Sequence, residues 1–107
     1  MGYNFGGFGG GNMQQLMRQA QKMQEEMRRI REEIDSTEYT STVGGGMVEI
    51  TILGNRTVKG VKIKKEVVDP DDVEMLEDLI VSATNDCLKK IADDERAKLP
   101  LVSKVRL

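Results

Sequence analysis

The sequence contains no histidine, no tryptophan, a single cysteine and only 4% aromatic residues. Without histidine, no imidazole can act as a general base, complete a histidine-based triad or dyad, or ligate a metal ion. The lone Cys87 cannot form an intrachain disulfide, and no cluster of cysteines is present to hold zinc. We therefore expect no enzyme activity, no small-molecule substrate, and neither a metal nor another cofactor.

Long apolar runs are also missing. No segment approaches the roughly 18 apolar residues that a membrane span requires. The first residues, "MGYNFGGFGGG", are glycine and aromatic rather than basic and then apolar, which is not the pattern of a secretory signal. We expect a cytoplasmic protein without a membrane partner.

The composition suits one small domain. Of 107 residues, 38% are hydrophobic and 32% are charged, so the core must be aliphatic and methionine-rich, and oligomerisation would be a natural way to bury more surface. Sixteen Lys and Arg residues face 18 Asp and Glu residues, which gives a net charge of −2. Any surface that binds nucleic acid must therefore be a local concentration of positive charge.

Residues 12–34 carry the pattern of a long amphipathic helix. Asn12 is a good N-cap, and the glycine-rich residues 1–11 before it are interpreted as a flexible tail, which leaves residues 12–107 as a single domain. The apolar positions alternate in steps of three and four, as in a heptad seam: Met13, Leu16, Ala20, Met23, Met27, Ile30 and Ile34. Such a stripe requires a surface that covers it.

Three β-strands are predicted next, at residues 36–43, 47–53 and 57–64, because these runs are rich in Thr, Val and Ile. Gly44, Gly45 and Gly46 separate the first two strands, and Gly54-Asn55 suits a two-residue hairpin turn between the second and third. Gly60 marks a β-bulge. The three strands together predict an antiparallel meander.

A second long helix is predicted to start at Asp69-Pro70, since Asp is a good cap and Pro is tolerated at the first helical position. Its apolar positions keep helical spacing and include Cys87, which we interpret as a buried packing residue. The acidic residues of its first turns lack the spacing of a calcium loop and are explained by capping and the helix dipole. The fold class is therefore α+β: long helix, three-stranded antiparallel sheet, long helix.

Basic residues concentrate in two places. "RTVKGVKIKK", from Arg56 to Lys65, has five basic residues and no acid, and either contacts a ligand or serves as a solvated strand face. The first helix carries five basic residues, yet opposite charges four residues apart predict local neutralisation, as in Lys22–Glu26, Glu25–Arg29, Arg28–Glu32 and Arg29–Glu33. Spacing alone favours a solvated face over a phosphate-binding stripe.

Three blocks together resemble the YbaB/EbfC family of bacterial nucleoid-associated DNA-binding proteins. They are "GGGNMQQLMRQAQKMQEEM" from Gly9, "VGGGMVEITILG" from Val43 and "DPDDVEMLEDLIVSATNDCLKK" from Asp69. The resemblance implies a tweezer-like homodimer that binds double-stranded DNA at the nucleoid with little sequence preference. It also implies that the apolar stripe packs against the second helix and the dimer mate.

The resemblance further implies that helical arms grip DNA, and that the arms are residues 12–34 and the later part of residues 70–98. The basic residues of these segments are the candidate phosphate contacts: Arg18, Lys22, Arg28, Arg29, Arg31, Lys89, Lys90, Arg96 and Lys98. The chain departs from the family pattern after the last helix, where Lys104 and Arg106 could add contacts to phosphates or to the dimer mate.

One alternative function stays open. The net charge of −2 and the balanced first helix also fit a dimeric adaptor, in which the methionine-rich helix docks against another protein.

Overall fold

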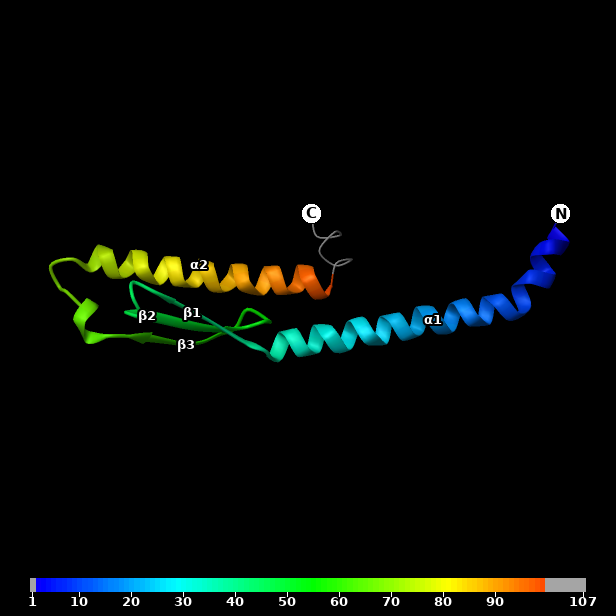
Figure 1. The fold of residues 1–107 in the computed structure, drawn as a ribbon, viewed down its shortest axis with the longest axis horizontal. Coiled ribbons are helices and arrows are strands. Elements are labelled where there is room, and N and C mark those ends of the chain that lie inside the picture. The colour runs from blue at the N-terminus through cyan, green and yellow to red at the C-terminus, as the bar shows by residue number, and fades with distance from the viewer. Residues whose placement is uncertain (1, 100–107) are drawn as a thin grey trace.

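A computed structural model describes the backbone of residues 2–99 and the side chains of residues 12–99. Two helices flank a three-stranded sheet, which confirms the predicted α+β class, and the molecule is elongated, 80 × 23 × 18 Å (Figure 1). The elements in chain order are α1 (Gly2–Ser36), β1 (Glu38–Val43), β2 (Val48–Leu53), β3 (Val58–Ile63), the single 3-10 turn η1 (Lys65–Val67) and α2 (Val73–Lys98).

The sheet is an antiparallel meander in the order β1-β2-β3, with α2 lying along one of its faces. Because side chains alternate along a strand, Val48, Ile50 and Ile52 of β2 all point toward α2 and are fully buried. Cys87 is completely buried opposite them, as predicted, with Ala83 and Ile91. The Cys87 thiol donates a hydrogen bond to the Tyr39 carbonyl at 2.9 Å.

Strand β3 has no helix above it. Val58, Val61 and Ile63 pair with the buried residues of β2 and therefore lie on the same face of the sheet, yet they are 39–54% exposed. The reason is that α2 packs over β1 and β2 only. A strip of apolar side chains is thus left open beside α2.

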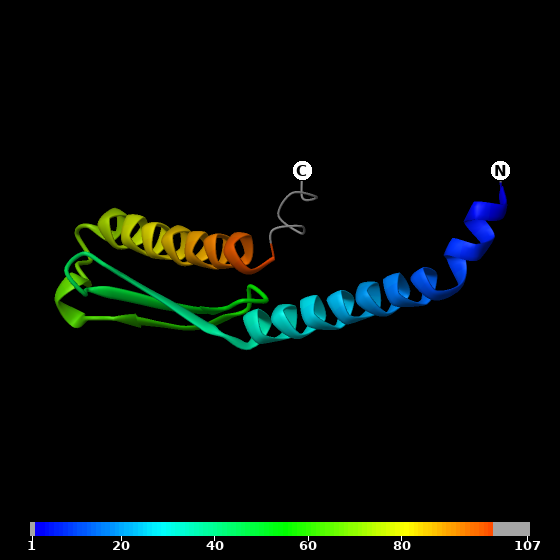
Figure 2. The same ribbon diagram turned by 45° about the vertical axis from the view of Figure 1, so that its right-hand side comes forward.

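Helix α1 projects beyond the end of the sheet, away from α2 (Figures 1 and 2). Its apolar stripe is buried only at its base, where Ile34 is 1% exposed, whereas Met13, Leu16, Met17 and Met23 are 54–61% exposed. The prediction that α2 of the same chain covers this stripe is therefore wrong beyond the last turns. No other segment of the described residues covers the stripe between Met13 and Met23.

Both predicted helix starts are wrong, that of α1 by about ten residues and that of α2 by three. Helix α1 begins at Gly2, so Asn12 lies inside it and is not its N-cap, because extending an existing helix costs far less than starting one. Helix α2 begins at Val73, and the carboxylate of Asp72 caps it by accepting a hydrogen bond from the Met75 amide at 3.2 Å. Asp69 caps a tight turn instead and accepts from the Asp71 amide. Lys104 and Arg106 lie outside the described residues.

The predicted turns are partly confirmed. Gly44, Gly45 and Gly46 all have positive φ, as the β1–β2 connection requires. The β2–β3 hairpin is a three-residue loop, and the residue with positive φ is Arg56, at 70°, so the prediction of a two-residue Gly54-Asn55 turn is wrong. The predicted bulge is present next to Gly60, where β2 and β3 shift register.

Gly54 joins α1 to the sheet by close backbone contact. A Cβ atom at residue 54 would lie 1.8 Å from the Ile34 carbonyl oxygen, so any side chain would push the end of α1 away. The Gly54 amide donates to the Thr37 carbonyl at 3.0 Å, and the Asn55 amide donates to the Asp35 carbonyl at 3.3 Å. The hairpin loop therefore holds the end of α1 through its backbone.

We expect Gly54→Ala to lower the free energy of unfolding by at least about 3 kcal/mol, because the added methyl group meets a backbone oxygen that cannot rotate away. Gly60→Ala is the matched control, since a Cβ there meets nothing within 4 Å and its effect should be within about 1 kcal/mol. Urea unfolding followed by circular dichroism at one protein concentration measures both. Equal stabilities of the two variants would contradict the close contact.

Candidate nucleic-acid interface

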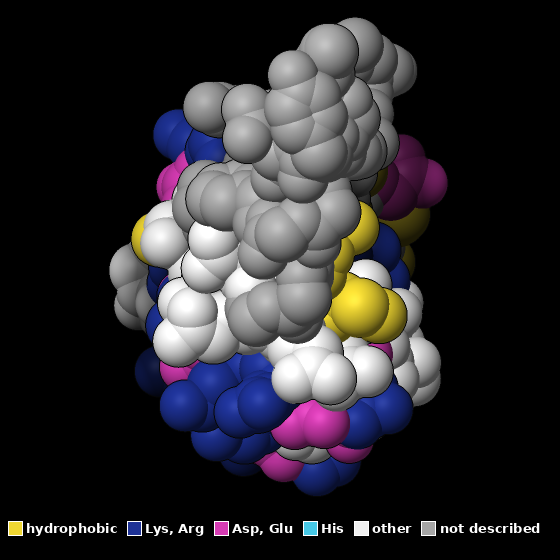
Figure 3. All heavy atoms as spheres, turned by 90° about the vertical axis from the view of Figure 1, so that its right-hand side faces the viewer, with side chains coloured by type: hydrophobic (Ala, Val, Ile, Leu, Met, Phe, Trp, Pro, Cys, Tyr) yellow, Lys and Arg dark blue, Asp and Glu magenta, His cyan; other side chains and the backbone are white. Residues whose placement is uncertain are grey.

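The projecting part of α1 carries a row of exposed basic side chains. At 100° per residue, positions 18, 22 and 29 lie within about 40° of one another, on the side of the helix away from the apolar stripe. Arg18, Lys22 and Arg29 are all exposed, as is Arg28 on a neighbouring face. Viewed toward the projecting end of α1, Lys and Arg side chains gather on one side of the molecule with Asp and Glu among them (Figure 3).

The opposite charges on α1 pair less than their spacing predicts. None of the four predicted pairs forms among the described residues; Arg29 lies instead 3.7 Å from Glu26, with both side chains more than 60% exposed. Exposed pairs of this kind contribute at most about 1 kcal/mol and are easily exchanged for another partner. Arg18, Lys22 and Arg28 extend into solvent without an ion pair in the described part of the chain.

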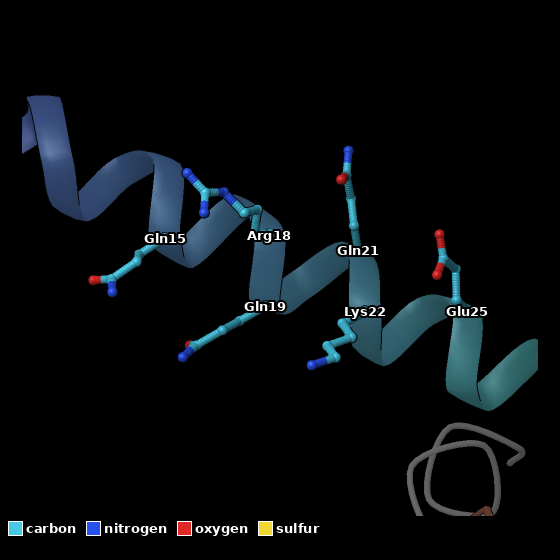
Figure 4. Close-up of a pocket in the computed structure, with 6 residues that line it drawn as sticks. All are labelled: Gln15, Arg18, Gln19, Gln21, Lys22 and Glu25. Carbon is cyan, nitrogen blue, oxygen red and sulfur yellow. The ribbon is translucent and has the colours of Figure 1, made fainter.

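The hollows along α1 are gaps between long side chains. One of them has a volume of about 430 Å³ and is open to solvent, with Gln15, Gln19 and Lys22 on one side of it and Arg18, Gln21 and Glu25 on the other (Figure 4). Every lining residue comes from one helix, whereas a small-molecule site is concave and mostly apolar. The arrangement suits contact with an extended, polar surface.

Arg31 differs from the other basic residues of α1 because it faces the body of the protein. Its guanidinium contacts Asp35 at 2.9 Å and Glu95 of α2 at 2.8 Å, and its side chain is 31% exposed. Arg31 therefore belongs to an internal ion-pair cluster. Using it for a phosphate contact would break these two pairs.

The basic residues of α2 do not extend the row on α1. The last turns of α2 lie against the base of α1 rather than projecting as a second arm, and most of their basic side chains have partners on their own domain. Lys90 donates to the Thr40 carbonyl at 2.8 Å, Lys98 lies 3.3 Å from Asp94, and Arg96 pairs with Asp93. Lys89 is exposed. The two sets of candidates thus occupy separate surfaces of one chain.

Glu95 is a charged residue on the buried face of α2, and sequence analysis did not single it out. It is 5% exposed and lies one turn after Ile91, so the spacing Ala83, Cys87, Ile91, Glu95 was the signal that could have identified it. The Glu95 carboxylate accepts two hydrogen bonds from the Arg56 guanidinium, of 2.8 and 3.0 Å, and lies 2.8 Å from the Arg31 guanidinium. With Asp35, the cluster contains two cations and two anions.

The hydrogen bonds from Arg56, opposed by burial and aided by Arg31, lower the pKa of Glu95 from 4.5 to about 2. The pKa of the nearby Tyr39 changes in the opposite direction, because burial and the hydrogen bond to Asp94 raise it above its usual value. Both effects are produced where α2 packs on the sheet and on the base of α1. They are structural and lie apart from the exposed row on α1.

Among the described residues, no three potential ligating side chains come together as a metal site, and no helix is both long and apolar enough to cross a membrane. What the described chain offers is an exposed charged helix projecting from a small α+β body. This arrangement defines a protein that binds a partner over an extended surface.

Comparison with known proteins agrees with this class. The chain belongs to the YbaB/EbfC DNA-binding family, whose model matches residues 9–104, and this is a family of nucleoid-associated DNA-binding proteins rather than enzymes. A nucleoid-associated protein of Clostridium acetobutylicum is 52% identical over 89% of this chain and 85% of its own length, and one of Agathobacter rectalis is 46% identical over 92% and 89%. The crystal structure of an uncharacterized Helicobacter pylori protein superposes with a TM-score of 0.66 at 26% identity, over 78% of this chain and 88% of that one.

The lowered pKa of Glu95 predicts an acid-dependent loss of stability. The ionised carboxylate stabilises the fold fully above pH 4.5, and this contribution is lost as the pH falls toward about 2. The difference in unfolding free energy between the wild type and Glu95→Gln should therefore shrink by about 3 kcal/mol over this range. Urea unfolding at fixed protein concentration between pH 7 and pH 2 measures it. A difference that does not change with pH would contradict the assignment, and Asp93→Asn on the exposed side of α2 is the control.

Proposed function

We propose that this protein is a nucleoid-associated protein that clamps double-stranded DNA as a homodimer, with the outer face of α1 contacting phosphates, and that it acts in the cytoplasm at the nucleoid. Family membership carries the proposal, together with the name that its relatives bear. The exposed row of Arg18, Lys22 and Arg29 supports it, because a phosphate clamp needs long cationic side chains on a rigid support. In this role the protein would organise the nucleoid or affect gene expression.

The homodimer is supported by the two apolar surfaces that one chain leaves open. One is the strip of Val58, Val61 and Ile63 beside α2, and the other is the stripe along α1 from Met13 to Met23. Strand β3 is also a sheet edge, which in a single chain invites pairing with another. A second copy that covers both surfaces would place two arms on one body and double the number of cations.

The mechanism is electrostatic. Lysine and arginine side chains that neutralise phosphates release condensed counterions, so affinity falls as salt rises, with a log–log slope of about −0.9 per phosphate. The net charge of −2 does not prevent this, since at 0.15 M salt charges interact over only about 8 Å and the row on α1 acts locally. Contacts to phosphates carry no sequence information, which fits binding with little sequence preference.

Removing two charges from the arm should flatten this salt dependence. We expect Lys22→Gln with Arg29→Gln to weaken binding to a labelled random-sequence duplex and to reduce the magnitude of the slope by up to about 3.6, since the dimer loses four cations. Fluorescence anisotropy across a salt series measures both quantities. The control, Lys64→Gln with Lys65→Gln, makes the same change in net charge near η1 at the other end of the molecule.

If the control pair alone weakened binding, the basic run from Arg56 to Lys65 would be the DNA surface. If the wild type did not bind saturably at low salt, the clamp would be wrong, and the exposed methionine stripe of α1 would favour the protein-docking alternative.

The proposed dimer surface gives a separate prediction. A charge at Val61 would be buried without a partner by a second copy, so Val61→Glu should shift the protein from dimer to monomer in light scattering after size exclusion. Lys62→Glu changes the next residue, which is on the opposite face of the same strand and whose side chain is 86% exposed, and should leave the dimer intact. A Val61→Glu dimer as tight as the wild type would place the interface elsewhere.

A further inference from the structure

The base of α1 is held by three segments that are far apart in the sequence. Arg31 comes from α1, Arg56 from the β2–β3 hairpin loop and Glu95 from the last turns of α2, and the Glu95 carboxylate contacts both guanidinium groups at 2.8 Å. Arg56 meets it as a two-pronged fork, the strongest and most directional form of this contact. The Glu95 carboxylate therefore links α1 to the β2–β3 hairpin loop and to α2.

Apart from this cluster, α1 has little to fix its direction. The Gly54 and Asn55 amides hold its final carbonyls at a single point, which can act as a pivot. Of its apolar stripe, Ile34 is buried and Met27 and Ile30 are half-buried, while the described residues from Asn12 to Glu26 are all exposed. The side chains of Arg31 and Asp35, one turn apart, are the polar groups placed to resist a tilt about the pivot.

A small tilt at the base becomes a large displacement along the arm. Positions 18 and 31 are 13 residues apart, or about 20 Å of helix, so a tilt of about 10° moves the outer basic row by roughly 3 Å. Charge-assisted hydrogen bonds to phosphate have lengths of about 2.7–2.9 Å, so such a shift is enough to lose them. The position of Arg18, Lys22 and Arg29 therefore depends more on how rigidly the base of α1 is held than on any contact close to these residues.

The backbone of the hairpin loop supports the same interpretation. Arg56 has a φ of 70°, in the left-handed region, which is unfavourable for a residue with a side chain. That conformation brings its guanidinium to Glu95, and the double contact offsets the cost. If Glu95 lost its charge, Arg31 would still have Asp35, but Arg56 would be left beside a second cation with no anion of its own.

We propose that Glu95 is the positioning residue of the arm: by binding Arg31 and Arg56 together it sets the direction in which α1 leaves the sheet. This inference rests on the proposed function for its consequence, which is that Glu95 controls DNA affinity without contacting DNA. The direction of the change in DNA affinity distinguishes this positioning role from an effect of net charge alone. Removing an acid should strengthen DNA binding through long-range attraction, whereas loss of arm position should weaken it.

The test measures arm direction and affinity in the same full-length variants. Spin labels at Gln21→Cys on α1 and Lys65→Cys on η1 report the distance between the projecting helix and the sheet by pulsed electron paramagnetic resonance. Both are introduced in a Cys87→Ser background, because the serine hydroxyl can keep the hydrogen bond to the Tyr39 carbonyl. Dilution with unlabelled protein leaves one labelled chain per assembly. Glu95→Gln should broaden or shift the distance distribution and weaken duplex binding several-fold. Asp93→Asn, with the same charge change on the exposed side of α2, should leave the distances unchanged and should not weaken duplex binding.

Arg56→Gln is the second variant, because it leaves Glu95 paired with Arg31 and so disturbs folding less; it should also broaden the distribution. Distances unchanged in both variants would overturn the positioning role. Altered distances in Glu95→Gln with an affinity equal to that of Asp93→Asn would overturn the link to DNA. If the wild type bound no DNA, the proposed function would fail, and the distances would still decide whether Glu95 positions the arm.

Discussion

Helix α2 packs over β1 and β2 and leaves β3 uncovered, and the rest of this structure depends on that placement. It buries Val48, Ile50 and Ile52 of β2, whereas Val58, Val61 and Ile63 of β3, on the same face of the sheet, are exposed. Among the described residues no other element lies over β3, because α1 projects away from the sheet. The chain consequently has a complete small core and, directly beside it, an apolar strip of the same chemistry that is open to water.

The projecting part of α1 is thus connected to the sheet and to α2 through a narrow region, where charged side chains contact one another. The apolar contribution at the base comes chiefly from Ile34, whereas Glu95, Arg31, Arg56 and Asp35 supply two positive and two negative charges. Buried ion pairs are not efficient sources of stability compared with apolar packing. They are directional, however, and direction is what a projecting helix requires.

Local patterns predicted most of the fold. The spacing of Ala83, Cys87 and Ile91 predicted the buried face of α2, and the three consecutive glycines predicted the positive-φ turn between β1 and β2. The start of α2 was misplaced because more than one residue could cap: Asp69 and Asp72 are equally good caps by type, and only the three-dimensional turn at Pro70 decides between them. The hairpin loop was misassigned for a related reason, since Gly54 is required by the approach of the Ile34 carbonyl and not by its own φ.

The candidate interface was less predictable than the fold. Exposure of Arg18, Lys22, Arg28 and Arg29 follows from the heptad pattern, and the same pattern puts Arg31 on the side of the apolar stripe. The pattern does not reveal the partner of Arg31, which is a residue 64 positions away. Contacts between residues 31, 56 and 95 leave no periodic trace in the sequence. The predicted pairs along α1 were wrong because a solvated ion pair is worth little, so side-chain entropy and hydration decide where these groups lie.

The projecting helix also has a consequence for local stability. Between Asn12 and Met23 its side chains are all exposed, and an isolated helix of this kind is marginal in water. Amide hydrogens there should exchange with solvent far faster than those of β2, whose opening requires the whole core to unfold. A molecule that covers the projecting part of α1 must supply the free energy that keeps this part helical. The helical content of α1 therefore measures the fraction of chains to which such a molecule is bound.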